Sequence, residues 1–85
     1  MKFKIQFVET GSNGEHITDT VEAVDNNAAI ATFVKRHYGN NAFFKFNVEL
    51  STGTRVYGQV FKRLGKTGGA YSLTNNCYID ADECE

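Results

Sequence analysis

The stretch from Val21 to Ile30 constrains the fold of this chain more than any other part of the sequence. Up to Val24, apolar residues alternate with polar ones, and this period of two is typical of a half-buried β-strand. Asp25 and the two asparagines after it can each cap a helix, because their side-chain oxygens accept hydrogen bonds from amides of the first turn. The stretch therefore predicts a strand that runs into a capped helix.

The predicted helix runs from this cap to about Tyr38. Lys35 and Arg36 lie in its last turn, where the helix dipole favours cations, and Gly39 ends it. Apolar or aromatic residues recur at the spacing of a single buried stripe, which comprises Ile30, Phe33, Val34, His37 and Tyr38.

Alternation of apolar and polar residues predicts the remaining strands, separated by Gly-, Asn- and Ser-rich turns. Asp19 is discordant, because it falls on the apolar face of its strand. In the third strand we expect Phe44, Phe46, Val48 and Leu50 to share one face. The predicted strands are residues 2–8, 15–24, 42–50, 54–64 and 70–79, the last being one strand or a pair interrupted at Asn75-Asn76, and the turns include Gly11–Gly14, Ser51–Gly53 and Gly65–Gly69.

The resulting order, β-β-α-β-β-β, predicts an α+β fold. We expect an antiparallel-dominated sheet of four or five strands with one helix on one face. Length and a hydrophobic content of 41% predict a single domain over residues 1–85. Four of the last six residues are acidic, and we expect residues 80–85 to form a flexible acidic tail.

No spacing in the sequence places a nucleophile beside a base or gathers metal ligands, so we expect a protein that is not an enzyme and holds no metal or cofactor. Cys77 and Cys84 could close a small disulfide loop, but we expect free thiols. The first residues alternate directly and no apolar run approaches the length of a membrane span. We therefore expect a cytoplasmic protein with no membrane partner.

Two short motifs were weighed for ligand binding. Gly65-Lys66-Thr67 resembles the end of a phosphate-binding loop, but Val60 stands where the pattern needs glycine, so a hairpin loop is the interpretation. Residues 55–62 partly match the sheet signature of RNA-recognition motifs, with Gln59 and Lys62 in place of stacking aromatics. Stacking of bases on Tyr57 or Phe61 beside basic residues remains the alternative function, namely binding of single-stranded RNA or DNA.

The better indication of function is the aromatic content of both faces of the third and fourth strands. One helix covers one face, which leaves Phe43, Tyr57, Phe61 and potentially Tyr71 toward solvent, and such patches often mark protein interfaces. A homodimer would also cover them. The candidate partner-binding residues are Phe43, Arg55, Tyr57, Phe61, Lys62, Arg63 and Lys66.

The segment Val21-Glu22-Ala23-Val24-Asp25, followed two residues later by Ala28-Ala29, resembles small phage-encoded anti-CRISPR proteins, in particular inhibitors of type I surveillance complexes. The resemblance covers residues 17–34 and the general layout after them. It implies a non-catalytic protein of phage or mobile-element type that binds a host CRISPR-Cas effector complex in the bacterial cytoplasm. It assigns no functional residue in this chain.

Overall fold

The structure, a computed structural model, describes residues 1–11, 13–49, 55–66 and 68–84. The predicted α+β class is confirmed: one helix packs on a sheet of six antiparallel strands. The elements are β1 (Lys2–Glu9), β2 (His16–Glu22), α1 (Asn26–Tyr38), β3 (Ala42–Phe46), β4 (Arg55–Arg63), β5 (Ala70–Ser72) and β6 (Cys77–Cys84).

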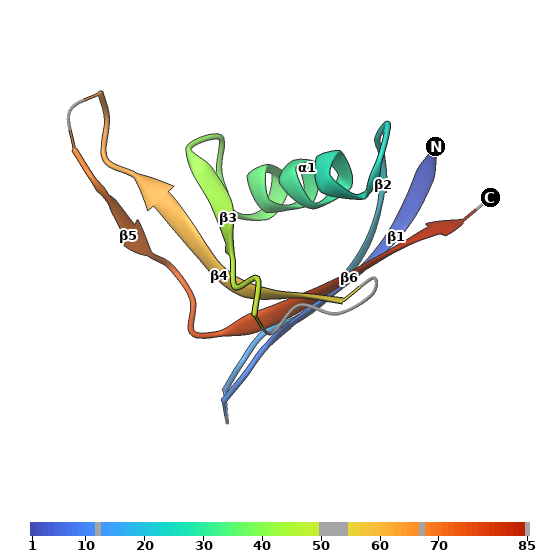
Figure 1. The fold of residues 1–85 in the computed structure, drawn as a ribbon, viewed down its shortest axis with the longest axis horizontal. Coiled ribbons are helices and arrows are strands. Elements are labelled where there is room, and N and C mark those ends of the chain that lie inside the picture. The colour runs from blue at the N-terminus through green and yellow to red at the C-terminus, as the bar shows by residue number, and fades with distance from the viewer. Residues whose placement is uncertain (12, 50–54, 67, 85) are drawn as a thin grey trace.

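The sheet is curved, and α1 lies in its concave side (Figure 1). The strand order is β2-β1-β6-β4-β3, and β5 pairs with β4 beyond the point where β6 ends its pairing. The last strand of the chain is therefore a central strand of the sheet. Between β5 and β6, the Val60 amide donates to the Thr74 hydroxyl at 3.1 Å, which replaces the backbone hydrogen bond that a continuous neighbouring strand would make. The segment predicted over residues 70–79 is therefore a pair of strands, β5 and β6, and not one strand.

The start of the helix follows the sequence closely. Asp25 is extended and accepts a hydrogen bond from the Ala28 amide at 2.8 Å, as the capping pattern predicts. Ile30, Phe33 and Val34 are buried against the sheet, whereas Tyr38 is half-buried and His37 lies near the surface. The core is one cluster between α1 and the sheet, built from the helix and from β1, β2, β3, β4 and β6; it includes Phe3, Ile5, Phe7, Val21, Val60, Cys77, Ile79 and Ala81.

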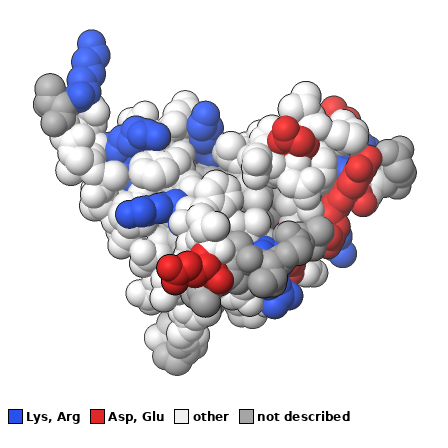
Figure 2. Space-filling view, viewed as in Figure 1, with Lys and Arg blue, Asp and Glu red and all other residues white. Residues whose placement is uncertain are grey.

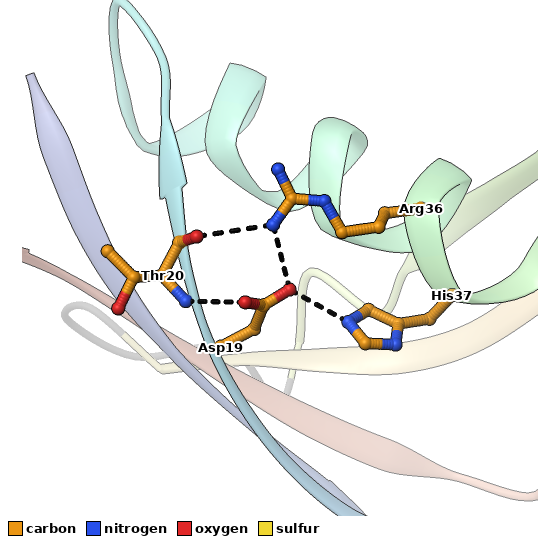
Figure 3. A network of polar contacts seen from close by, with 4 residues as sticks. All are labelled: Asp19, Thr20, Arg36 and His37. Carbon is orange, nitrogen blue, oxygen red and sulfur yellow. Dashed lines mark hydrogen bonds and ion pairs between the residues drawn. The ribbon is translucent and has the colours of Figure 1, made fainter.

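Asp19, the discordant residue of β2, belongs to a polar network with the end of α1 (Figure 3). Its carboxylate contacts Arg36 Nη1 at 3.0 Å and His37 Nε2 at 2.9 Å. It also accepts from the Thr20 amide, while Arg36 donates to the Thr20 carbonyl. The Ala23 amide donates to the Met1 carbonyl, and the Glu9 amide donates to the Glu15 carbonyl, so the odd-numbered residues of β2 bond to β1. In an antiparallel ladder the residues between them point their backbone groups the other way, so the N–H and C=O of Thr20 face the outer edge. The network therefore caps the outer edge of the sheet at Thr20.

The expected flexible acidic tail over residues 80–85 is wrong. Residues up to Cys84 belong to β6, which pairs with β1 along its whole length. Ile79 and Ala81 are fully buried, and they alternate with the acidic residues Asp80 and Asp82. Asp80 pairs with Arg55, and opposite charge lets a carboxylate occupy a central strand. Glu85 lies outside the described residues.

The third strand is shorter than predicted. It ends at Phe46, and Asn47 closes the pairing by donating to the Tyr57 carbonyl at 2.7 Å. Phe46 is 44% exposed and Val48, which already lies in a turn, is 81% exposed. Of the three described members of the expected apolar face, only Phe44 enters the core. Leu50, the turn Ser51–Gly53 and Thr67 of the Gly65–Gly69 loop lie outside the described residues.

Candidate functional site

The sheet face opposite α1 is the candidate site, and it is called here the open face. Alternate residues of β4 point to it, as do those of β3 and β6 that lie opposite them in the register. Phe43 lies opposite Phe61, and Tyr57 lies opposite Tyr78. The structure thus brings five of the seven sequence-predicted candidates onto one face: Phe43, Arg55, Tyr57, Phe61 and Arg63.

The first group on this face is the phenylalanine cluster, made by Phe43, Phe61, Lys45 and Arg63. The two rings stack with centroids 5.9 Å apart. The Arg63 guanidinium lies 4.3 Å from the Phe43 centroid, and the Lys45 ammonium lies 5.4 Å from that of Phe61. Each cation interacts with a ring face, and no described carboxylate forms an ion pair with either of them. The cluster therefore presents half-buried aromatic surface with uncompensated positive charge.

The second group is the tyrosine cluster, made by Tyr57, Tyr78, Arg55 and Asp80. The tyrosine centroids are 5.8 Å apart, and the Arg55 guanidinium lies 4.0 Å over the Tyr78 ring. Arg55 also makes a bidentate pair with Asp80, with Nε–Oδ1 at 3.1 Å and Nη2–Oδ2 at 3.0 Å. Hydrogen bonds to Asp80 and then Tyr57 raise the pKa of Arg55. Because Arg55 is held by its ion pair with Asp80, its guanidinium stays over the Tyr78 ring and restricts the position of that ring.

Two candidates lie elsewhere. Lys62 is opposite Ala42 in the register, so it points to the helix side of the sheet, and Lys66 lies in the turn between β4 and β5. Tyr71, the further aromatic expected on this face, lies opposite Lys62 and shares its side. Sequence reasoning missed Asp80 because residues 80–85 were expected to form a tail. It missed Tyr78 because local alternation does not show that β6 pairs with β4. It also left out Lys45, although that residue alternates with the apolar side chains of its strand.

Charge is unevenly distributed over the molecule. Residues 42–72 carry five Lys or Arg side chains and one acidic residue, Glu49, which gives +4. The rest of the chain carries four basic and nine acidic side chains, which gives −5. Figure 2 shows the basic side chains gathered over the side of β3, β4 and β5, and acidic ones gathered over the side of the termini. An anionic partner is therefore attracted to the β3–β4 side.

Other chemistry-bearing groups are placed for structural roles. Cys77 is buried, and burial raises the pKa of its thiol to about 11, which makes it a poor nucleophile. Cys84 lies seven positions further along the same strand, about 23 Å away at 3.3 Å per residue, so the two cannot form a disulfide. His37 stacks against Phe33 with centroids 4.5 Å apart. Across residues 1–11, 13–49, 55–66 and 68–84, no three His, Cys, Asp or Glu side chains are grouped to bind a metal.

Comparisons of the chain with protein-family models, with curated proteins and with solved structures gave no match. Within the described part of the chain, α1 is too short and too polar to cross a lipid bilayer.

Proposed function

We propose that this chain is a non-catalytic binding protein that contacts a partner protein through the phenylalanine and tyrosine clusters of its open face. The observation that supports it is the placement of four aromatic rings and three cations on the sheet face that α1 leaves uncovered. Aromatic residues and arginine are enriched in protein interfaces, where a few of them provide most of the binding free energy.

The phenylalanine cluster is the stronger half of this surface. Lys45 and Arg63 have no ion-pair partner in the described residues, so a partner carboxylate can approach them without displacing an existing pair. The aromatic ring under each cation limits its side-chain freedom before binding, which reduces the entropy lost on association. Within the tyrosine cluster, Arg55 is already paired with Asp80, so this cluster contributes aromatic contact surface more than net charge.

The finer proposal is that the partner is a host CRISPR-Cas effector complex, which the protein inhibits. It is motivated by the resemblance at residues 21–29. In this fold Val21 and Ala29 are buried and Asp25 caps α1, so each of these residues has a folding role. The resemblance therefore supports the layout of the chain, and the contact residues come from the open face.

The test uses tagged protein with a bacterial host lysate and, separately, a purified type I surveillance complex. Phe61→Ser and Lys45→Glu remove a ring and reverse a charge on the open face. Val24→Ser is the matched apolar control, because Val24 is 76% exposed. Lys2→Glu is the matched charge control, because Lys2 lies at the start of β1, outside the phenylalanine and tyrosine clusters. We expect one stoichiometric protein partner that both open-face variants lose and both controls retain. Capture of no partner, or equal capture by all variants, would contradict the proposal.

Single-stranded nucleic acid is the second candidate. The stacked pair Phe43–Phe61 favours it, because it lies beside two cations that form no ion pair with a described carboxylate. Bases stack on exposed rings with little sequence preference, and phosphates bind adjacent Lys and Arg. Fluorescence anisotropy with mixed-sequence single-stranded RNA and DNA at low salt tests it. Binding that weakens steeply with salt and is lost in Phe61→Ser would establish this function, whereas absence of binding would exclude it.

A further inference from the structure

The second surface of interest is a groove of about 460 Å³ between α1 and the edge strand β3. One wall of the groove is a stripe of residues along one side of α1, and the other wall is formed by residues between 40 and 46. The groove therefore runs along both elements for most of the length of β3. Its lining residues include Asn27, Ile30, Ala31 and Lys35 from α1, and Phe43, Phe44, Phe46 and Arg63 from the sheet.

The outer edge of β3 offers backbone hydrogen-bonding groups to this groove. Arg63 donates to the Asn41 carbonyl and Asn47 donates to the Tyr57 carbonyl, so the odd-numbered residues of β3 pair with β4. In an antiparallel ladder the residues between them direct both backbone groups outward. Phe44 and Phe46 therefore present N–H and C=O groups to the edge, where β3 has no neighbouring strand among the described residues.

The outer strands β2 and β3, at the two ends of the five-strand path, differ in how their edges are protected. At β2 the Asp19–Arg36 network occupies both backbone groups of Thr20, which prevents another strand from pairing there. At β3, no described side chain bonds the outward groups of Phe44 or Phe46. The edge of β2 is therefore blocked at Thr20, whereas the outward groups of β3 stay accessible among the described residues, beside a partly apolar groove.

We propose that β3 and this groove bind an extended, acidic segment of a partner protein, which adds to the sheet as a further strand. Main-chain bonds to Phe44 and Phe46 would hold it, and its alternate side chains would enter the groove beside α1. Charge favours an acidic occupant: among the described residues, the groove is lined by two cations, Lys35 and Arg63, and by no carboxylate. It also lies on the basic side of the molecule, and a segment of five or six residues matches β3 at ~3.3 Å per residue.

This inference can fail independently of the proposed function. The groove and the open face share Phe43 and Arg63 at the edge, but Lys35 and Phe46 line the groove and belong to neither open-face cluster. Phe61 and Lys45 belong to the open face and do not line the groove. Phe61→Ser is therefore expected to leave binding in the groove unchanged.

The probe is a blocked octapeptide of alternating valine and glutamate, compared with the same peptide carrying lysine in place of glutamate. Nuclear magnetic resonance follows each titration and the hydrogen exchange of backbone amides. We expect the acidic peptide to bind at least about tenfold more tightly than the basic one. At saturation we expect the Phe44 and Phe46 amides to gain about tenfold or more in exchange protection, because they become hydrogen-bonded.

Phe46→Pro removes one outward N–H without removing a bond to β4, and Phe46→Ala is its matched control that keeps the N–H. We expect the proline variant to lose at least about tenfold in peptide affinity and the alanine variant much less. Lys35→Glu should lose a similar factor, and Lys2→Glu should lose none. If Phe46→Pro fails to fold by circular dichroism, the exchange data and Lys35→Glu decide the question.

Three results would overturn the proposal. The first is no binding of the acidic peptide at millimolar concentration. The second is equal binding of both peptides with no added protection of the Phe44 and Phe46 amides. The third is concentration-dependent protection of these amides in the protein alone together with a doubled mass by sedimentation, which would assign the β3 edge to a second copy of the chain.

Discussion

Replacement of Gly58 by alanine tests how closely β3 approaches β4. Gly58 lies in β4 opposite Phe46 and Cys77, so it is flanked by strands on both sides. A Cβ at this position would overlap the backbone carbonyl oxygen of Lys45 and lie 2.9 Å from a ring carbon of Phe44. The clash is mainly with backbone, which cannot rotate away as a flexible side chain would. The Lys45 carbonyl would therefore have to move by on the order of 1 Å.

The expected cost follows from two contributions. Overpacking of this kind costs about 1–3 kcal/mol, and weakening the ladder bond between Lys45 and Gln59 adds about 1 kcal/mol. We expect Gly58→Ala to lower the free energy of unfolding by roughly 2–4 kcal/mol, which lowers the melting temperature by roughly 8–30 °C for a chain of this size. Thermal and urea unfolding followed by far-ultraviolet circular dichroism measure this, since the chain has no Trp.

Gly69→Ala is the matched control, because a Cβ at Gly69 meets no atom within 4 Å and its backbone is not in the left-handed region. This variant should be unchanged or up to about 1 kcal/mol more stable through its effect on the unfolded state. The difference between the two variants isolates the clash at Gly58. Equal unfolding midpoints for Gly58→Ala and Gly69→Ala would refute the close approach of β3 and β4.

Three further predictions concern buried or paired groups. The pKa of Asp19 is lowered, first by its hydrogen bond with His37. The ionised Asp19 carboxylate therefore stabilises the folded state above its unfolded pKa of about 3.9, and this contribution is lost as the pH falls below that value. Asp19→Asn should cost about 0.5–1 kcal/mol at pH 7 and flatten acid unfolding curves, and an unchanged curve would contradict this. The Tyr38 hydroxyl is buried without a partner in the described residues, so Tyr38→Phe should be neutral or stabilise by up to about 1 kcal/mol in urea unfolding, whereas a marked loss would reveal a missed bond. Because Cys77 is buried with a raised pKa, iodoacetamide at pH 8 should label Cys84 first by mass spectrometry, and equal labelling would argue against a buried Cys77.

Local rules were sufficient to predict much of this fold. The cap at Asp25, the helix stripe from Ile30 to Val34 and the alternation of Phe3, Ile5 and Phe7 each depend on neighbours within one element. Periodicity therefore predicts the class and the single helix. The discordant Asp19 is explained only by Arg36 and His37, which the fold brings from the end of α1.

Long-range pairing is what the sequence does not reveal. The last strand inserts between β1 and β4, and this placement supplies Tyr78 and Asp80 to the open face. Acidic residues at a chain end are typical of a solvated tail, and only the partner Arg55 makes a central position favourable for Asp80. The accessible β3 edge also depends on strand order, so no local pattern around Phe44 or Phe46 could predict it.

The central claim is that α1 covers one face of the sheet and leaves the aromatic rings of the other accessible to a partner. A soluble paramagnetic relaxation agent measures this accessibility ring by ring in the nuclear magnetic resonance spectrum of the free protein. The claim predicts marked broadening of ring protons of Phe43 and Phe61, and little at Phe7 and Phe33, which are fully buried between α1 and the sheet. Equal protection of all four rings in dilute solution would contradict it.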